Sequence, residues 1–148
     1  MDVNDITLTL QIWDTAGDKK MLSIGKSLYK NADGIILVYD ITSRASFRSL
    51  DMYWDNFLKH SGTDEAEFFP AVLVGNKSDL SAKRDVSLEE VIEWCTNRRP
   101  QKQITYLECS AKLNIGVKVM SCGVLIFHFM PISYLCKGVC TQLTDILP

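Results

Sequence analysis

The sequence has no surplus of charge of either sign. Its 16 lysines and arginines nearly balance 18 aspartates and glutamates, which excludes a strongly basic nucleic-acid binder and an acidic disordered tail. The five cysteines contain no C-x-x-C pair, and their odd number completes no disulfide framework, so we expect mostly buried thiols in a reducing compartment. The first five residues are polar and acidic, so we expect no signal peptide and a cytoplasmic protein.

Charge is also scarce in one part of the chain. The last 36 of the 148 residues have only three charged side chains, Lys118, Lys137 and Asp145, while residues 1–112 have the other 31. The last element of a globular domain normally has a charged, solvated face. We therefore predict a domain over residues 1–116 and a hydrophobic tail of different character over residues 117–148.

Apolar residues in the first part follow the periods of strands. One segment alternates apolar and polar residues, which predicts a half-buried strand, and the others are short unbroken apolar runs, typical of buried strands. The predicted strands are Ile6–Ile12, Ile35–Tyr39, Ala71–Val74 and Ile104–Leu107.

Two further segments have the apolar spacing of helices. The first follows Ser43, which we expect to be its N-cap. The second begins at Ser87, which forms a capping-box pattern with Glu90. The residues expected on one face of this helix are Leu88, Val91, Ile92 and Cys95. Because strands alternate with helices, the sequence predicts an α/β domain with a mostly parallel sheet.

Polar loops follow three of the predicted strands, at Asp14–Gly17, Asn76–Asp79 and Ser110–Lys112. In parallel sheets, ligands bind at the carboxyl ends of the strands. A single loop of this kind is usually an ordinary turn. Three of them after separate strands predict a common binding site.

These loops resemble the third, fourth and fifth guanine-nucleotide motifs of Ras-like small GTPases in order and spacing. The motifs are Asp14-Thr15-Ala16-Gly17, Asn76-Lys77-Ser78-Asp79 and Ser110-Ala111-Lys112. The Trp13 that precedes the first motif resembles the Rab family. The late-endosomal branch of that family is similar in three further stretches, which are Leu50–Leu58, Phe69–Pro70 and Trp94–Cys95. The resemblance covers about residues 3–116. It implies an incomplete Ras-like GTPase fold and a relation to GTP-controlled vesicle and endosomal traffic.

The resemblance also implies a role for the residues that would hold the guanine base. Asp79 would accept hydrogen bonds from both N–H groups on the Watson–Crick edge of guanine, and sites of this kind discriminate by roughly 10⁴ or more. Asn76 would join the loops, the alkyl stem of Lys77 would lie on the base, and the N–H of Ala111 would donate to the guanine carbonyl. The residues expected to support this loop are Ser110 and Lys112.

On the phosphate side, the resemblance implies that Asp14 holds Mg²⁺ through water and that the N–H of Gly17 contacts the γ-phosphate of GTP. Asp18 stands where the family has its catalytic Gln. An amide can accept from water and donate to phosphate, whereas a carboxylate only accepts and is itself negatively charged. We therefore expect slow hydrolysis even in a complete domain.

No G-x-x-x-x-G-K-[ST] phosphate loop occurs in the 148 residues. Gly25-Lys26-Ser27 is no such loop, because Lys20 stands where the first glycine would be. By resemblance, the chain starts before the third strand of the family sheet, without the first strand, phosphate loop and first switch. We expect weak binding of GTP, GDP and Mg²⁺, and leave open whether the chain is an enzyme. The alternative is a non-catalytic interaction fragment, or a remnant from alternative splicing or an incorrect gene model.

The tail allows three interpretations. Val119–Cys136 is eighteen residues without a charge, which just reaches the length of a membrane span. The tail could instead fold into the gap of the missing first strand, which in the family lies between the strands found here at Ile6–Trp13 and Ile35–Tyr39. The third interpretation is a non-homologous end. No C-terminal prenylation motif is present, so the expected partners are guanine nucleotide and, by resemblance, Rab effectors or regulators; membrane association stays open.

Overall fold

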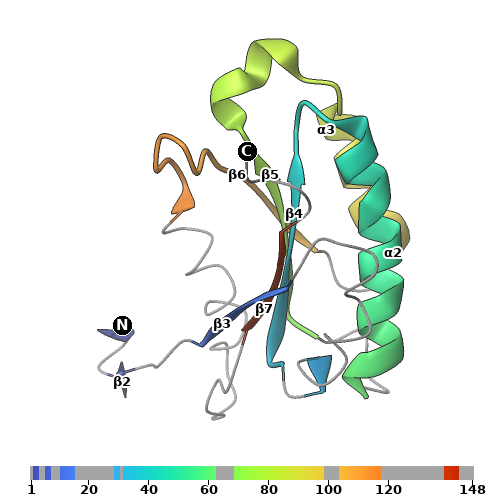
Figure 1. Cartoon of the computed structure of the whole chain (residues 1–148), viewed down its shortest axis with the longest axis vertical. Coiled ribbons are helices and arrows are strands. Elements are labelled where there is room, and N and C mark those ends of the chain that lie inside the picture. Colours follow the sequence, from blue (N-terminus) through green and yellow to red (C-terminus); the bar gives the residue numbers. More distant parts are fainter. Residues whose placement is uncertain are drawn as a thin grey trace.

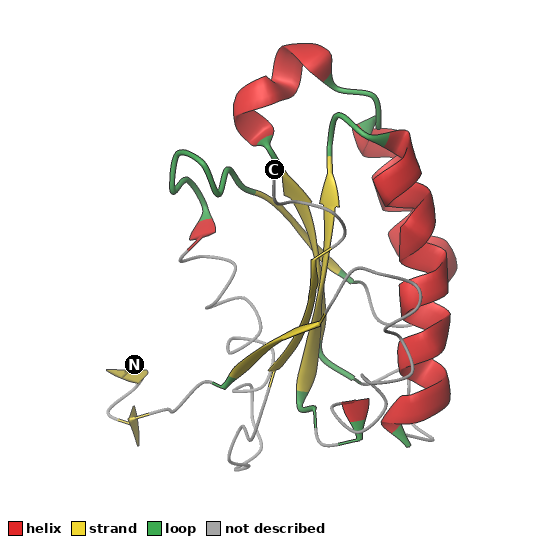
Figure 2. Ribbon diagram, viewed as in Figure 1, coloured by secondary structure: helices red, strands yellow, loops and turns green. Residues whose placement is uncertain are grey.

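The computed structural model describes residues 2–3, 6–7, 11–15, 29–30, 32–62, 69–98, 104–117 and 139–143. Five parallel strands form one sheet in the order β3-β7-β4-β5-β6, and helices α2 and α3 lie on one side of it (Figures 1 and 2). The predicted parallel α/β architecture is confirmed. The elements are β3 (Ile12–Thr15), β4 (Gly34–Asp40), α2 (Arg44–Ser61), β5 (Ala71–Asn76), the 3₁₀ helix η2 (Ser78–Lys83), α3 (Leu88–Arg98), β6 (Thr105–Glu108) and β7 (Val139–Leu143).

The central strands β4 and β5 are buried along their whole length, as their unbroken apolar runs predict. Successive residues of a strand face opposite sides of the sheet. In β4, Ile35, Leu37 and Tyr39 belong to the core cluster that includes the buried aromatic side chains of α2. Ile36 and Val38 are buried as well. Both faces of β4 are therefore covered, which fixes the position of its carboxyl end.

The structure divides the predicted N-terminal strand. Ile6–Thr7 forms β2, which pairs antiparallel with β1 (Asp2–Val3) in a separate two-stranded sheet. The strand of the main sheet, β3, begins only at Ile12. The prediction of a single strand over Ile6–Ile12 is therefore wrong. Alternation shows that a segment can be half buried, but it does not show its pairing partner, and here the partner of β2 is its sequence neighbour β1.

Both helices begin at the predicted caps. The hydroxyl oxygen of Ser43 accepts a hydrogen bond from the backbone N–H of Ser46 at 3.3 Å. Ser87 and Glu90 form the reciprocal capping box, with the Ser87 N–H donating to the Glu90 carboxylate at 3.0 Å and the Glu90 N–H donating to the Ser87 hydroxyl at 3.3 Å. These contacts satisfy N–H groups that have no partner inside the helix.

The predicted apolar face of α3 is only partly buried. Val91 and Cys95 are buried, but Leu88 and Ile92 are 47% and 49% exposed. At 100° per residue, Val91 and Cys95 lie at one edge of the apolar stripe, and Leu88 and Ile92 lie at its other edge. The four residues share one face, as the sequence predicts, and Val91 and Cys95 are the two of them that are buried in the core.

The tail contributes a strand to the sheet. β7 pairs in parallel with β3 on one side and with β4 on the other, as Figure 1 shows. This is the arrangement expected if the tail folds into the gap between these strands. Val119–Cys136 lies outside the described residues, and the domain boundary at residue 116 stays a prediction. Among the helices that the structure describes, none is long and apolar enough to cross a membrane.

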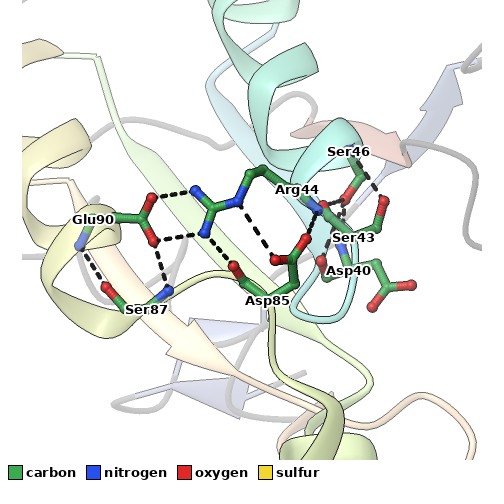
Figure 3. Close-up of polar contacts among 7 residues, drawn as sticks. All are labelled: Asp40, Ser43, Arg44, Ser46, Asp85, Ser87 and Glu90. Atoms are coloured by element: carbon green, nitrogen blue, oxygen red, sulfur yellow. Dashed lines mark hydrogen bonds and ion pairs between the residues drawn. The ribbon is translucent and has the colours of Figure 1, made fainter.

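Arg44, at the start of α2, ties this helix to the start of α3 (Figure 3). Its guanidinium forms an ion pair with Glu90 and donates to the backbone oxygen of Asp85 at 2.5 Å. The backbone N–H of Arg44 donates to the Asp85 carboxylate at 3.1 Å. One arginine therefore joins the segment after β4 to the segment between η2 and α3.

The ion pair of Arg44 and Glu90 predicts sensitivity to acid. Hydrogen bonds from Arg44 and Ser87 lower the pKa of Glu90 from 4.5 to about 2. A carboxyl group with a depressed folded-state pKa stabilises the fold above its unfolded pKa, and this contribution disappears as the pH falls from about 4.5 to about 2. We expect Arg44→Met to flatten the loss of thermal stability over this range, measured by melts between pH 6 and pH 2.5.

Arg48→Met is the control, since Arg48 is an exposed arginine of the same helix. It should leave the acid dependence unchanged. Equal pH profiles for the wild type and Arg44→Met would contradict this role of the ion pair.

Candidate functional site

The two loops predicted to hold the base meet at one edge of the sheet. In the register of β4 and β5, Asn76 lies opposite Asp40, and in that of β5 and β6, Gly75 lies opposite Glu108. Because the strands are parallel, the residues after β5 and β6 leave the sheet at the same level. The N–H of Ser78 donates to the backbone oxygen of Cys109 at 3.0 Å, which joins the two loops directly.

Asn76 links the loops through its side chain. It is 4% exposed, and its Oδ1 accepts hydrogen bonds from the backbone N–H of Ala111 at 3.0 Å and from the thiol of Cys109 at 3.5 Å. The predicted joining role of Asn76 thus has a geometric basis. The Ala111 N–H, however, is directed at Asn76, so a guanine carbonyl would have to share this donor.

Asp79 and Ser110 form the second link between the loops. Ser110 is fully buried, and its hydroxyl donates to Oδ1 of Asp79 at 2.6 Å while accepting from the backbone N–H of Leu113 at 3.1 Å. In the described part of the chain, no hydrogen bond reaches Oδ2 of Asp79. The carboxylate is therefore held by one oxygen and has the other free for a ligand that offers N–H groups.

Lys77 is held over the end of β4. Its backbone is left-handed, with φ of 66°, a conformation that is costly for a residue with a β-carbon. Its Nζ lies 2.9 Å from Oδ2 of Asp40, and the N–H of Leu80 donates to its backbone oxygen at 2.8 Å. These two contacts fix where the lysine stem can lie.

Asp40 is a site residue to which the sequence analysis gave no function. Burial alone would raise the pKa of its carboxyl group, but hydrogen bonds from Lys77 and Thr42 hold that pKa below its ordinary value. Thr42 donates to Oδ1 through both its N–H, at 2.8 Å, and its hydroxyl, at 2.7 Å. Asp40 therefore stays ionised and anchors Lys77. The available signal was its position as the polar residue that closes the apolar run of β4.

The loop after β6 is a tight turn with two left-handed residues. Ser110 and Ile115 exchange backbone hydrogen bonds at 2.9 and 3.0 Å, and Asn114 and Gly116 have φ of 55° and 75°. Lys112 is exposed on this turn. A β-carbon at Gly116 would lie 2.8 Å from the backbone oxygen of Glu108. The turn that presents Ser110 therefore requires glycine at this position.

We expect Gly116→Ala to destabilise the chain more than Gly62→Ala. Both glycines have positive φ, which costs an alanine about 1 kcal/mol, but a β-carbon at Gly62 meets nothing within 4 Å. The clash at Gly116 should add about 1–3 kcal/mol. Urea unfolding of both variants measures the difference, and equal losses would show that the close approach to Glu108 does not constrain the turn.

The structure does not bring Asp14 to this group. Asp14 lies within β3, opposite Thr141 of β7, which in turn lies opposite Ile36 of β4. Ile36 precedes Asp40 by four residues, or about 13 Å along the strand. Asp14 is exposed, and among the described residues no three potential metal ligands gather. Gly17 and Asp18, with the rest of the expected phosphate side, lie outside the described residues.

In the part of the chain that the structure describes, the loops after β5 and β6 are joined by hydrogen bonds, and no Mg²⁺ site is formed. That these loops hold a guanine base stays a prediction. Asn76 is hydrogen-bonded to Ala111, and Asp79 to Ser110. Lys77, which stands between the first residues of these two pairs in the sequence, is held by Asp40. Sequence reasoning missed the supporting residues, although Cys109 and Asp40 both stand next to predicted strand ends.

The chain is similar to one known protein family and to several curated proteins. The Ras family model matches residues 1–124. The Ras-related protein Rab7 of Drosophila melanogaster is 42% identical over 117 residues, which are 79% of this chain and 55% of that protein. Rab-7a of Dictyostelium discoideum is 40% identical over 116 residues, 78% of this chain and 56% of that protein.

The Ypt/Rab-type GTPase ypt7 of Schizosaccharomyces pombe is 41% identical over 117 residues, 78% of this chain and 56% of that protein. The chain thus spans about half the length of the curated relatives it matches. Since the family model covers most of its residues and these relatives are all Rab7-like, the chain belongs to the Ras family of small GTPases, in its late-endosomal Rab branch.

Proposed function

We propose that the chain binds the base of guanine nucleotides through the loops after β5 and β6. The observation that supports this is the Oδ2 of Asp79, which no hydrogen bond from the described residues reaches, on a carboxylate whose other oxygen is held at 2.6 Å by the buried Ser110. Guanine presents two N–H donors side by side, and adenine does not. A fixed carboxylate would therefore select guanine, because adenine would leave it unpaired.

The affinity of the 148-residue chain should be modest. Phosphate groups are usually bound by N–H donors at a helix N-terminus and by a lysine of the phosphate loop, and this sequence contains no such loop. Asp14, the proposed Mg²⁺ residue, lies away from the base loops in the register of the sheet. We expect a Kd for GDP no tighter than tens of micromolar, or about −6 kcal/mol, with little effect of Mg²⁺.

Calorimetry with GDP, with and without Mg²⁺, tests this proposal. Saturable binding in the expected range would support a base site without a phosphate site. Nanomolar affinity would mean that the chain also binds the phosphate groups of GDP. A lack of saturable GDP binding would refute the base site.

At the level of the cell, we propose a relation to GTP-dependent regulation of vesicle and endosomal traffic, with Rab effectors or regulators as partners. The membership in the Rab branch supports this. Asp18, which stands in the place of the family Gln, favours a second candidate: a non-catalytic chain that acts through interactions.

A further inference from the structure

The 3₁₀ helix η2, which contains Asp79, is held in place mainly by polar contacts. None of its six residues is buried, so its position depends less on the packing of apolar side chains. At its start, the N–H of Ser78 donates to the backbone oxygen of Cys109, and Asp79 accepts from Ser110. Both contacts join η2 to the loop after β6. The placement of the Asp79 carboxylate therefore depends on how η2 lies against the end of β6.

Arg84 adds a contact between the same two segments at the other end of η2. It directly follows the helix, and its Nη2 donates at 2.8 Å to Oε2 of Glu108, the last residue of β6. The two side chains are 27% and 30% exposed, so solvent screens this ion pair less than one on the open surface. The next residues, Asp85 and Val86, donate to the backbone oxygen of Ile41. The chain after η2 thus turns to the end of β4, while Arg84 reaches back to β6.

The other oxygen of Glu108 is held from the core. The hydrogen bond from Arg84 holds the pKa of Glu108 below its ordinary value, so this carboxylate is ionised and can only accept. The hydroxyl of Tyr106 donates to its Oε1 at 2.7 Å. A tyrosine hydroxyl has one hydrogen, so in the 3.0 Å contact between the hydroxyls of Tyr106 and Tyr39, Tyr39 is the donor. Because Tyr39 is fully buried in β4, the carboxylate is fixed between the core and Arg84.

We propose that Arg84 and Tyr106 are positioning residues for guanine recognition. By holding both oxygens of Glu108, they fix the end of β6 against η2, and this fixes the Asp79 carboxylate for two N–H donors at once. The proposal rests on the base-binding function proposed above. A displaced carboxylate can still accept from one N–H, but it cannot align with two donors that the base holds at a set separation. Recognition of the 2-amino group of guanine therefore depends on residues that do not themselves bind the base.

The preference for GDP over inosine diphosphate measures this alignment. The base of inosine diphosphate has the ring N–H of guanine but no 2-amino group, so it offers Asp79 one donor. The wild type should bind GDP at least roughly tenfold more tightly, the usual effect of one hydrogen bond to a charged group. Arg84→Met should lower this preference to less than about threefold, because GDP then loses one hydrogen bond and inosine diphosphate loses none. Tyr106→Phe, which removes only a hydroxyl, should lower the preference in the same direction.

Arg98→Met is the matched control. Arg98 is 28% exposed and pairs with Asp51 and Asp55 of α2, so the substitution removes a comparable ion pair without loosening η2. It should lower the melting temperature and leave the preference for GDP over inosine diphosphate unchanged. Arg84→Lys keeps a charged donor for Glu108 and should keep most of the preference. A merely structural role of Arg84 would instead weaken both nucleotides in proportion.

An unchanged preference in Arg84→Met would overturn the positioning role, as would an equal loss of preference in Arg98→Met. A wild type that binds GDP without preferring it to inosine diphosphate would also overturn it. If Arg84→Met does not fold, Tyr106→Phe decides in the same way. Failure of the base site itself is distinguishable, because the wild type would then bind GDP no better than ADP, and the positioning role would be refuted with it.

Discussion

Replacement of Asp79 by asparagine is expected to change the base preference of this chain from guanine to xanthine. The amide oxygen of the new side chain can still accept from the Ser110 hydroxyl, as Oδ1 of Asp79 does at 2.6 Å. The amide nitrogen then takes the place of the free Oδ2. An N–H₂ group directed at the two donors of guanine is unfavourable, whereas xanthine has a carbonyl oxygen at C2 that can accept from it.

The expected size is a loss of GDP affinity of about 100-fold, or about 2.8 kcal/mol, with a gain for xanthosine diphosphate. Competition binding with both nucleotides measures the change. Asp55→Asn is the control, because Asp55 is an exposed carboxylate on α2 that pairs with Arg98, away from the site. It removes the same charge and should leave both affinities unchanged. An Asp79→Asn variant with the base preference of the wild type would show that Asp79 does not contact the base.

Asp18→Gln is expected to increase GTP hydrolysis only where the phosphate side of the domain is complete. Hydrolysis requires a held γ-phosphate, a bridging Mg²⁺ and a water molecule aimed in line. We expect no measurable turnover by the 148-residue chain, with or without the substitution. In a chimera, the part of Drosophila Rab7 that precedes the match would be joined to residue 3, and the family C-terminal helix would follow residue 116.

The chimera should bind GTP and hydrolyse it slowly, because the carboxylate of Asp18 cannot donate to phosphate. Asp18→Gln in the chimera should raise the rate on the order of 100-fold, the usual effect of one donor that stabilises developing charge. Single-turnover assays of all four proteins measure this. Rapid hydrolysis by the native chain, or no gain from the substitution in the chimera, would show that Asp18 has another role.

The sequence predicted those parts of the fold that depend on local pattern. β4 and β5 are unbroken apolar runs, and short runs of this kind are typical of strands that are buried on both faces. The caps at Ser43 and Ser87 were also predictable, because a side chain near the first free N–H groups of a helix acts locally. The grouping of Asn76, Asp79 and Ser110 followed from the parallel direction of the strands.

The features that were not predicted depend on partners distant in the sequence or on a choice among partners. The pairing of β2 with β1 is such a choice, which the period of apolar residues does not show. The insertion of β7 between β3 and β4 was one of three interpretations of the tail, among which the sequence could not decide. The same holds for Asp40, whose role arises only when Lys77 folds back over the end of β4. The distance of Asp14 from the base loops follows from the register of β7, which no residue pattern in β3 encodes.

The most direct test of the base site is a protein-observed NMR titration of the 148-residue chain with GDP and, separately, with ADP. We predict that GDP shifts the amide signals of Asn76–Asp79 and Ser110–Lys112 in a saturable way, while ADP at the same concentration leaves them in place. Equal shifts with both nucleotides, or shifts confined to other residues, would contradict the conclusion that these two loops recognise guanine.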